Sequence, residues 1–216
     1  MGTTVRNGAG LGEKGGGVTF KSIHVDMCIA SRQCWGMSKS DKTKSAILNV
    51  ARKQFWAHGY SNVSLRDITS EVGVDVALVS RYFGSKLGLF QATLVDVYDW
   101  PELFESRNPD VAKVLIERLR DDETGQAVVQ MLIANITDPE VGDMVQEDFT
   151  KRVVAPLETI VGSAWAKERV GMFLAAMIGM SMMRNSFGLT GISDVSDESY
   201  AQQLQHLARN ALRYIA

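Results

Sequence analysis

The sequence predicts an all-α protein in which a small N-terminal head of three helices (residues 38–88) precedes a larger C-terminal helical body (residues 89–216). Apolar residues recur at three- and four-residue spacing along most of the chain, which is the period of an amphipathic helix. No segment shows the strict alternation of a half-buried strand, and Ser, Asp, Gly and Pro stand where helices should begin and end. With 216 residues, 45% of them apolar, the chain is long enough to bury a core.

Residues 1–37 are expected to form a flexible tail, because they hold eight of the nineteen glycines and show no sustained period. Organised sequence starts directly after Met37, so a start site assigned too far upstream or a cloning remnant explains this tail as well as a functional arm does. Both cysteines, Cys28 and Cys34, lie in the tail and give no disulfide framework, which suits a reducing compartment.

The first helix of the head is predicted for residues 41–58. Ile47, Ala51 and Phe55 recur at four-residue steps. Lys42 lies in the first turn, where the helix dipole disfavours a cation, and this small cost is offset if the ammonium group meets a phosphate. A solvated lysine explains the position equally well.

A short second helix is predicted to begin after Ser64, a natural N-cap, with Asp67 three residues on to return the bond. Gly73 follows it and supplies a left-handed C-cap that a residue with a Cβ would resist.

A third short helix follows the Gly73 turn and is expected to bury Val79 and Phe83, which are four residues apart. Two short helices across a glycine turn describe a helix-turn-helix, whose second helix can lie in the major groove of DNA. The residues expected to face outward are Val76, Ala77, Ser80 and Arg81, followed by Tyr82 and Lys86.

From about Lys42 to Leu94 the chain carries a series of motifs, which are a helix ending in Phe-x-x-x-Gly-Tyr, then Arg-Asp-Ile, Gly-Val and Phe-x-Ser-Lys. Their residues are Phe55, Gly59, Tyr60, Arg66, Asp67, Ile68, Gly73, Val74, Phe83, Ser85 and Lys86. In these motifs the chain resembles the TetR family of transcriptional regulators. This resemblance implies a DNA-binding head on a helical body that binds a ligand and dimerises.

The expected DNA contacts divide into base-reading and phosphate-binding residues. Arg66 is expected to read a base, since a bidentate arginine–guanine pair is the commonest specific contact, although a surface ion pair with Asp67 or Glu71 is the alternative. Small or polar side chains at Val76, Ala77, Ser80 and Arg81 suit base edges, whereas Lys42, Tyr82 and Lys86 suit phosphates. Many family members carry Gly near position 77 and an aromatic residue at position 80, so Ala77 and Ser80 leave the operator sequence open.

The charge distribution agrees with a polyanionic partner for the head. Residues 38–90 hold eight Lys/Arg against four Asp/Glu, giving +4, while residues 91–216 hold eleven against nineteen, giving −8.

A fourth helix is predicted from Ser85 to about Trp100, because the residue before Pro101 is biased away from helix. In the TetR family the equivalent helix joins the head to the body, so the resemblance places the domain boundary within or near it. Beyond it every segment is predicted to be helical, and Pro156 should kink or split its helix.

Two C-terminal helices are expected to form a dimer seam. Residues 165–188 are apolar nearly all round, and residues 197–215 carry a one-sided apolar stripe, so pairing two copies about a two-fold axis would bury both in a four-helix bundle. The seam residues are Met172, Met183, Leu204, Leu207 and Leu212.

A pocket for a small hydrophobic ligand is expected in the body, since methionine fills irregular space adaptably. Its candidate residues are Trp100, Met131, Asn135, Phe173, Met177, Met180 and Arg184. The spacing of the methionines along the helix, taken alone, favours a role in the core and the dimer seam over a role in a ligand pocket. Asn135 and Arg184 are polar positions within apolar helices that either orient a ligand or face solvent.

Enzymatic function finds little support. The three histidines lack metal-ligand spacing, no phosphate-binding loop or nucleophile motif occurs, and no cofactor or metal is expected. No apolar run reaches the roughly 18–20 residues of a membrane span, and no signal peptide is visible, so a cytoplasmic protein is the default expectation.

The sequence and the resemblance together predict a homodimeric repressor that binds a pseudo-palindromic operator, with half-sites about 34–36 Å apart or a multiple of that distance, and is released by a small molecule. Two alternatives stay open. One is a constitutive DNA-binding dimer without a ligand, and the other is a helical interaction protein that does not regulate transcription.

Overall fold

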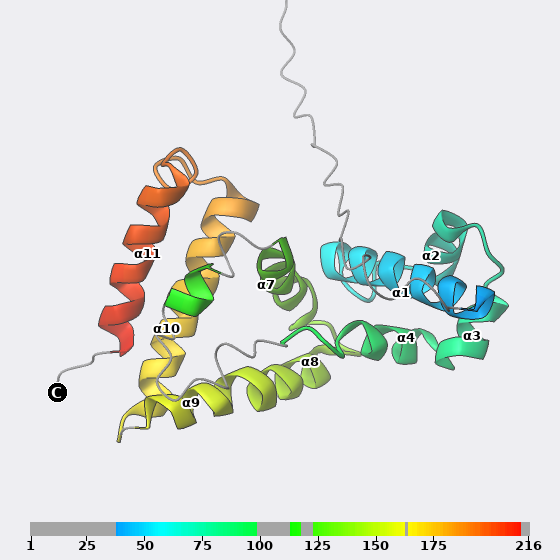
Figure 1. Ribbon diagram of the computed structural model, residues 1–216, viewed down its shortest axis with the longest axis horizontal. Coiled ribbons are helices and arrows are strands. Elements are labelled where there is room, and N and C mark those ends of the chain that lie inside the picture. The colour runs from blue at the N-terminus through cyan, green and yellow to red at the C-terminus, as the bar shows by residue number, and fades with distance from the viewer. Residues whose placement is uncertain (1–37, 99–112, 118–122, 163, 213–216) are drawn as a thin grey trace, which may run out of the picture.

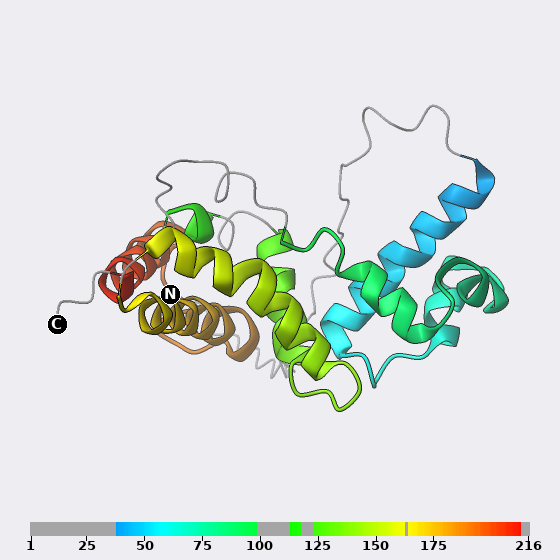
Figure 2. The same ribbon diagram turned by 90° about the horizontal axis from the view of Figure 1, so that it is seen from below.

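The computed structural model describes residues 38–98, 113–117, 123–162 and 164–212. Figure 1 shows two lobes, one holding the first four helices and the other holding the later ones, and the separation persists after a quarter turn in Figure 2. All regular elements within the described ranges are helical and none is a strand, so the all-α prediction is confirmed. Trp100, expected in the ligand pocket, lies outside these ranges.

The first lobe contains α1 (Lys39–His58), α2 (Leu65–Val72), α3 (Ala77–Phe83) and α4 (Lys86–Thr93). Helix α1 begins two residues before its predicted start, because the side chain of Ser38 accepts a hydrogen bond from the Asp41 N–H while the Asp41 carboxylate accepts one from the Ser38 N–H.

The core of this lobe centres on three aromatic rings. Phe55 of α1, Tyr60 in the following turn and Phe90 of α4 lie with their ring centroids 5.3–5.7 Å apart, and their exposed fractions are 0%, 2% and 0%. Val79 of α3 is fully buried as predicted, but the expected burial of Phe83 is wrong, because this residue lies at the edge of the core and is only partly covered.

Helix α4 ends at Thr93, several residues before the predicted end near Trp100. The carbonyl oxygen of Thr93 accepts a hydrogen bond from Arg52 Nε at 3.2 Å, and those of Leu94 and Val95 accept from Arg152 Nη1 and Nη2 at 2.8 and 2.7 Å. Arginine side chains therefore satisfy the carbonyl groups at the end of α4 and in the two residues that follow it.

The body contains α7 (Glu123–Asn135), α8 (Gly142–Phe149), α9 (Ala155–Val161), α10 (Ala166–Ser181) and α11 (Asp197–Leu212), with a helical segment at residues 113–117. A π-helical segment η1 (Thr150–Val154) joins α8 to α9, and another, η2 (Met182–Phe187), extends α10. Pro156 lies in the first turn of α9 directly after η1, where the hydrogen-bonding pattern changes from π-helical to α-helical while the chain stays helical.

Helices α10 and α11 pack side by side at the far end of the body, and apolar residues of both meet there. The stripe of α11 faces α10 of the same chain, since Tyr200, Leu204 and Ala208 are buried. The assignment of Leu204 to a dimer seam is therefore corrected, because a side chain with 0% exposure has no surface left for a partner. Met183 and Leu212 are half-buried.

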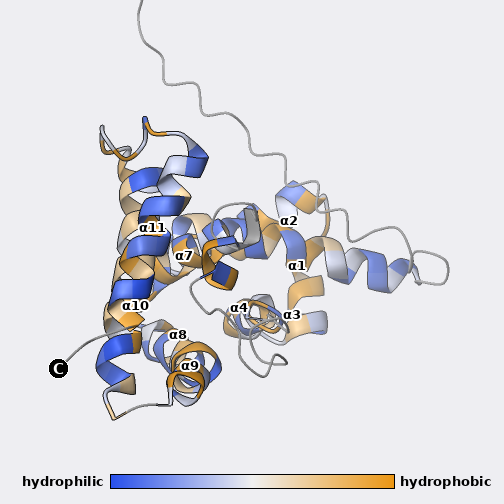
Figure 3. Ribbon diagram, turned by 60° about the vertical axis from the view of Figure 1, so that its left-hand side comes forward, coloured by the Kyte–Doolittle hydropathy of each residue, from blue (hydrophilic) through white to orange (hydrophobic). Residues whose placement is uncertain are grey.

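Much of the outer face of α11 is hydrophilic in Figure 3. Large apolar side chains nevertheless reach solvent in this part of the body, where Trp165, Met172, Phe187 and Leu207 are 48%, 67%, 69% and 43% exposed. No helix among the described residues has the length and apolar character needed to cross a bilayer.

Candidate nucleic-acid interface

Helix α2 presents Arg66 to solvent at its N-terminal end. The side chain of Ser64 accepts from the Asp67 N–H at 3.2 Å and donates to the Asp67 carboxylate at 2.6 Å, which fixes the start of the helix. These hydrogen bonds from Ser64 lower the pKa of the Asp67 carboxyl, so the carboxylate persists in mild acid. Gly73 closes α2 in the left-handed conformation, with φ 75° and ψ 39°, as predicted.

Among the described residues, Arg66 does not form the surface ion pair with Asp67 or Glu71 that was the alternative to base reading. Asp67 is engaged by Ser64, and Glu71 is engaged by Lys53 at 3.9 Å and by Gln54 at 2.6 Å. Arg66 is exposed and forms no ion pair with any described residue, so its guanidinium is available to a partner molecule.

Helix α3 exposes the face that the sequence predicted. Ala77, Ser80 and Arg81 are exposed, and Val76, which precedes the helix as its N-cap, is 41% exposed. The carboxylate of Asp75 accepts from the Ala77 N–H at 2.7 Å and so fixes the first turn. Small side chains at the start of the helix leave room for a base edge to approach the backbone.

The residues predicted to bind phosphates fall into two groups. Lys42 is exposed in the first turn of α1, and Ser40 in the same turn donates to the Tyr82 hydroxyl at 3.1 Å, which brings the start of α1 beside the end of α3. Lys86 is half-buried instead, with its ammonium group 4.2 Å from the centroid of the Tyr60 ring.

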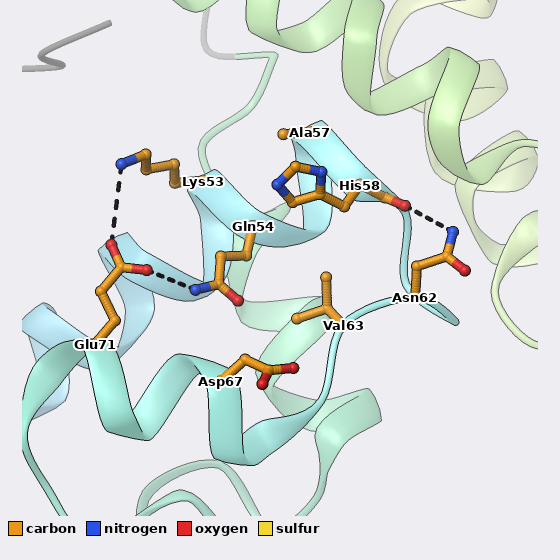
Figure 4. Close-up of a pocket in the computed structure, with 8 residues that line it drawn as sticks. All are labelled: Lys53, Gln54, Ala57, His58, Asn62, Val63, Asp67 and Glu71. Atoms are coloured by element: carbon orange, nitrogen blue, oxygen red, sulfur yellow. Dashed lines mark hydrogen bonds and ion pairs between the residues drawn. The ribbon is translucent and has the colours of Figure 1, made fainter. Parts of the chain in front are cut away.

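A groove of about 410 Å³ lies between α1 and α2 (Figure 4). Figure 4 shows Lys53 and Gln54 of α1 reaching towards Glu71 of α2. These polar contacts hold α2 against α1 and so position the helix that carries Arg66. The groove is lined by Lys53, Gln54, Ala57, His58, Asn62, Val63, Asp67 and Glu71.

The residues expected to line a ligand pocket are mostly core residues. Met131, Phe173 and Met177 are 0%, 0% and 2% exposed, and Met180 is half-buried. A second hollow, of about 500 Å³ beside α9 and the start of α10, contains none of the predicted pocket residues.

The two polar residues of that set have structural partners. Arg184 donates to the Asp197 carboxylate at 2.6 Å and lies 4.2 Å over the Tyr200 ring, so it attaches η2 to the start of α11. Asn135 has 0% exposure, which rules out the alternative that it faces solvent, and both ends of its amide are hydrogen-bonded within the chain.

Comparison with protein families gives two matches that follow one another along the chain. Residues 47–93 match the model described as bacterial regulatory proteins, tetR family, and residues 108–212 match the model described as tetracyclin repressor-like, C-terminal domain. The protein belongs to the TetR family. Members of the TetR family are DNA-binding transcriptional regulators, and α2 with α3 is the helix-turn-helix of this member.

Solved structures of other regulators share the fold. Salmonella enterica GusR is 19% identical with a TM-score of 0.62, and the match covers 82% of this chain and 99% of that one. NalD, the secondary repressor of the MexAB-OprM multidrug efflux pump in Pseudomonas aeruginosa, is 22% identical with a TM-score of 0.60, covering 81% and 96%. A TetR-family regulator from Streptomyces coelicolor is 20% identical with a TM-score of 0.52, covering 82% and 98%. No curated protein matches the sequence significantly.

Proposed function

We propose that this TetR-family member is a ligand-responsive repressor that binds a pseudo-palindromic operator as a homodimer. The observation that carries the proposal is the exposed surface of the helix-turn-helix, where Arg66, Ser80 and Arg81 reach solvent from two adjoining helices. In this proposal Arg66, Val76, Ala77, Ser80 and Arg81 contact base edges, and Lys42, Tyr82 and Lys86 contact phosphates.

The dimer is supported by apolar surface that a monomer would leave in water. Met172 on α10 and Phe187 at the end of η2 are each about two-thirds exposed, at 67% and 69%, and Leu207 on α11 is 43% exposed. Pairing α10 and α11 with their copies about a two-fold axis would cover this surface and set the two recognition helices on opposite half-sites.

Release by a small hydrophobic ligand follows from linkage. The body has two arrangements, one in which the spacing of the heads fits the two half-sites and one in which it does not. A ligand that binds the second arrangement more tightly lowers the affinity of the dimer for DNA, at most by the ratio of the ligand's affinities for the two arrangements. We place this site between α7 and α10, where Met131, Phe173 and Met177 pack and Met180 keeps partial access.

Selection of genomic DNA fragments with the purified full-length protein tests the proposal. We expect enriched fragments to share an inverted repeat. A protein that enriches no sequence would support the helical interaction protein instead. A protein that binds an inverted repeat, but is not released from it by any member of a panel of small apolar compounds, would support the constitutive dimer.

Substitutions at Arg66 and Lys42 should weaken operator binding in different ways. Arg66→Ala is expected to cost about 1–3 kcal/mol and to relax the preference at one base pair, because it removes a bidentate base contact. Lys42→Ala should weaken binding to all sequences alike and lower the salt slope by about one, because it removes one phosphate contact. Binding titrations at several salt concentrations, on the operator and on single-base variants, measure both effects.

Arg66→Lys is the matched control, because it keeps the charge and loses the planar fork. It should keep most of the salt dependence of the wild type and still lose the base preference. Equal losses on every sequence from Arg66→Ala and Lys42→Ala would contradict the assignment of Arg66 to base reading.

A further inference from the structure

A fully buried amide joins the first lobe to the body. Asn135, the last residue of α7, donates through Nδ2 to the carbonyl oxygens of Phe55 in α1 at 3.2 Å and Met131 in α7 at 2.8 Å. Its Oδ1 accepts from the Tyr60 N–H at 2.8 Å. Both N–H donors of the amide and its oxygen are therefore used, and the side chain has 0% exposure.

The C-terminal ends of α1 and α7 meet at this amide, and each end carries partial negative charge on its last carbonyl groups. The two negative helix ends repel each other, and an amide that donates a hydrogen bond to a carbonyl of each helix offsets this repulsion. An apolar residue of similar size would leave the buried Tyr60 N–H without the acceptor it now has, which is the costly case for a hydrogen bond.

Neighbouring contacts make the α1–α7 joint, formed by residues 59–61 against residues 134–140, both close and specific. Gly59 has φ 84°, and a Cβ there would lie 2.9 Å from the Ala134 carbonyl oxygen, so the two backbones touch. The Asp138 carboxylate accepts from the Ser61 N–H at 3.1 Å. The Tyr60 hydroxyl donates to Glu140 at 2.7 Å.

The body holds the first lobe at a second point. Arg152 in η1 donates to the carbonyl oxygens of Leu94 and Val95 just beyond α4. Both attachments thus come from residues 135–152, the end of α7, α8 and the start of η1. Because α1 also packs along α7, a shift of α7 relative to α8 would carry the first lobe against the contacts that Arg152 makes and so change its tilt.

We propose that Asn135 is a positioning residue for operator binding, whose buried amide sets the angle between the first lobe and the body and so the half-site spacing that the dimer accepts. The proposal rests on the proposed function, because spacing has meaning only for a dimer on two half-sites. Asn135 touches no surface that DNA can reach, and it acts through the turn that carries Tyr60.

The test compares the wild type with Asn135→Asp, using the full-length protein and a series of operators whose half-sites are moved together or apart by one base pair at a time. Aspartate has the shape of asparagine but loses both donors and places a carboxylate against two carbonyl oxygens. We expect the wild type to prefer one spacing sharply. In the variant this discrimination should fall about tenfold, as expected from the loss of one or two hydrogen bonds, while base preference within a half-site is unchanged.

Asn49→Asp is the matched control, because Asn49 is an exposed residue of α1 and undergoes the same chemical change. It should keep the spacing preference of the wild type. If Asn135→Asp does not fold, Tyr60→Phe and Asp138→Ala each loosen the α1–α7 joint without touching the buried amide, and both should broaden the spacing preference.

A wild-type spacing profile in Asn135→Asp, or in both substitutes where that variant is unfolded, would overturn the proposal. A loss of affinity that is equal at every spacing would also overturn it, since that result describes a merely structural residue. A wild-type protein that binds no operator would instead refute the proposed function.

Discussion

Replacing Phe90 by alanine is expected to lower the free energy of unfolding by about 3–5 kcal/mol, a large part of the margin of a small domain. Phe90 is 0% exposed and meets the rings of Phe55 and Tyr60 edge to face, at 5.5 and 5.3 Å between centroids. Its removal would leave a cavity between α1 and α4 and would forfeit both ring contacts. Urea unfolding followed by circular dichroism measures the change.

Phe83→Ala is the informative comparison, because the four-residue spacing of Val79 and Phe83 predicts that Phe83 is buried. Part of its side chain already contacts water, so its truncation should cost roughly half as much as that of Phe90 or less. Val95→Ala, at a position that is 62% exposed, should be nearly neutral. An equal or larger loss at Phe83 would contradict the aromatic trio as the centre of this core.

A charge at Leu207 is expected to separate the proposed dimer and to weaken operator binding about 10²- to 10⁴-fold, the usual gain from linking two binding modules. Leu207 lies beside the buried stripe of α11 and is 43% exposed, so Leu207→Glu should fold while placing a carboxylate in an apolar seam. Sedimentation at micromolar protein measures the association, and titration of the operator measures the affinity.

Gln202→Glu is the matched control, since Gln202 is exposed on the opposite side of α11 and gains the same charge. It should remain dimeric with little change in affinity. A wild-type protein that sediments as a 23.7 kDa monomer, or a Leu207→Glu variant that stays dimeric with unchanged operator affinity, would remove this seam from the model of function.

Most of the candidate DNA-contact surface could be predicted from the sequence, because its geometry depends on residues close together in the chain. Ser64 and Asp67 are three residues apart and satisfy each other within one helical turn, and Gly73 takes the left-handed conformation that ends α2. Once these helix ends are set, the period of α3 buries Val79 and leaves Ser80 outside. The pattern needs no information from distant parts of the chain.

The spacing of apolar residues in the C-terminal helices led to the assignment of the whole α11 stripe to a dimer seam, which is more than a spacing can decide. The period of α11 correctly placed Tyr200, Leu204 and Ala208 on one face, but a stripe does not say which apolar surface covers it. In the structure that surface is α10 of the same chain. The candidate ligand residues Met131, Phe173 and Met177 share this ambiguity, since a side chain suited to a pocket is equally suited to a core.

What the sequence determined by itself are the all-helical class, the Ser64 and Gly73 caps of α2 and the exposed face of the helix-turn-helix, because these depend on residues within a few positions of one another. Only the tertiary structure decided that α4 ends at Thr93 and that Asn135 is buried, because the partners are Arg52, Tyr60 and Arg152, which lie 41–75 positions away. A polar residue in an apolar helix signals only that a hydrogen-bond partner is needed. The packing of α7 against α1 supplies that partner, and with it the joint between the DNA-binding lobe and the body.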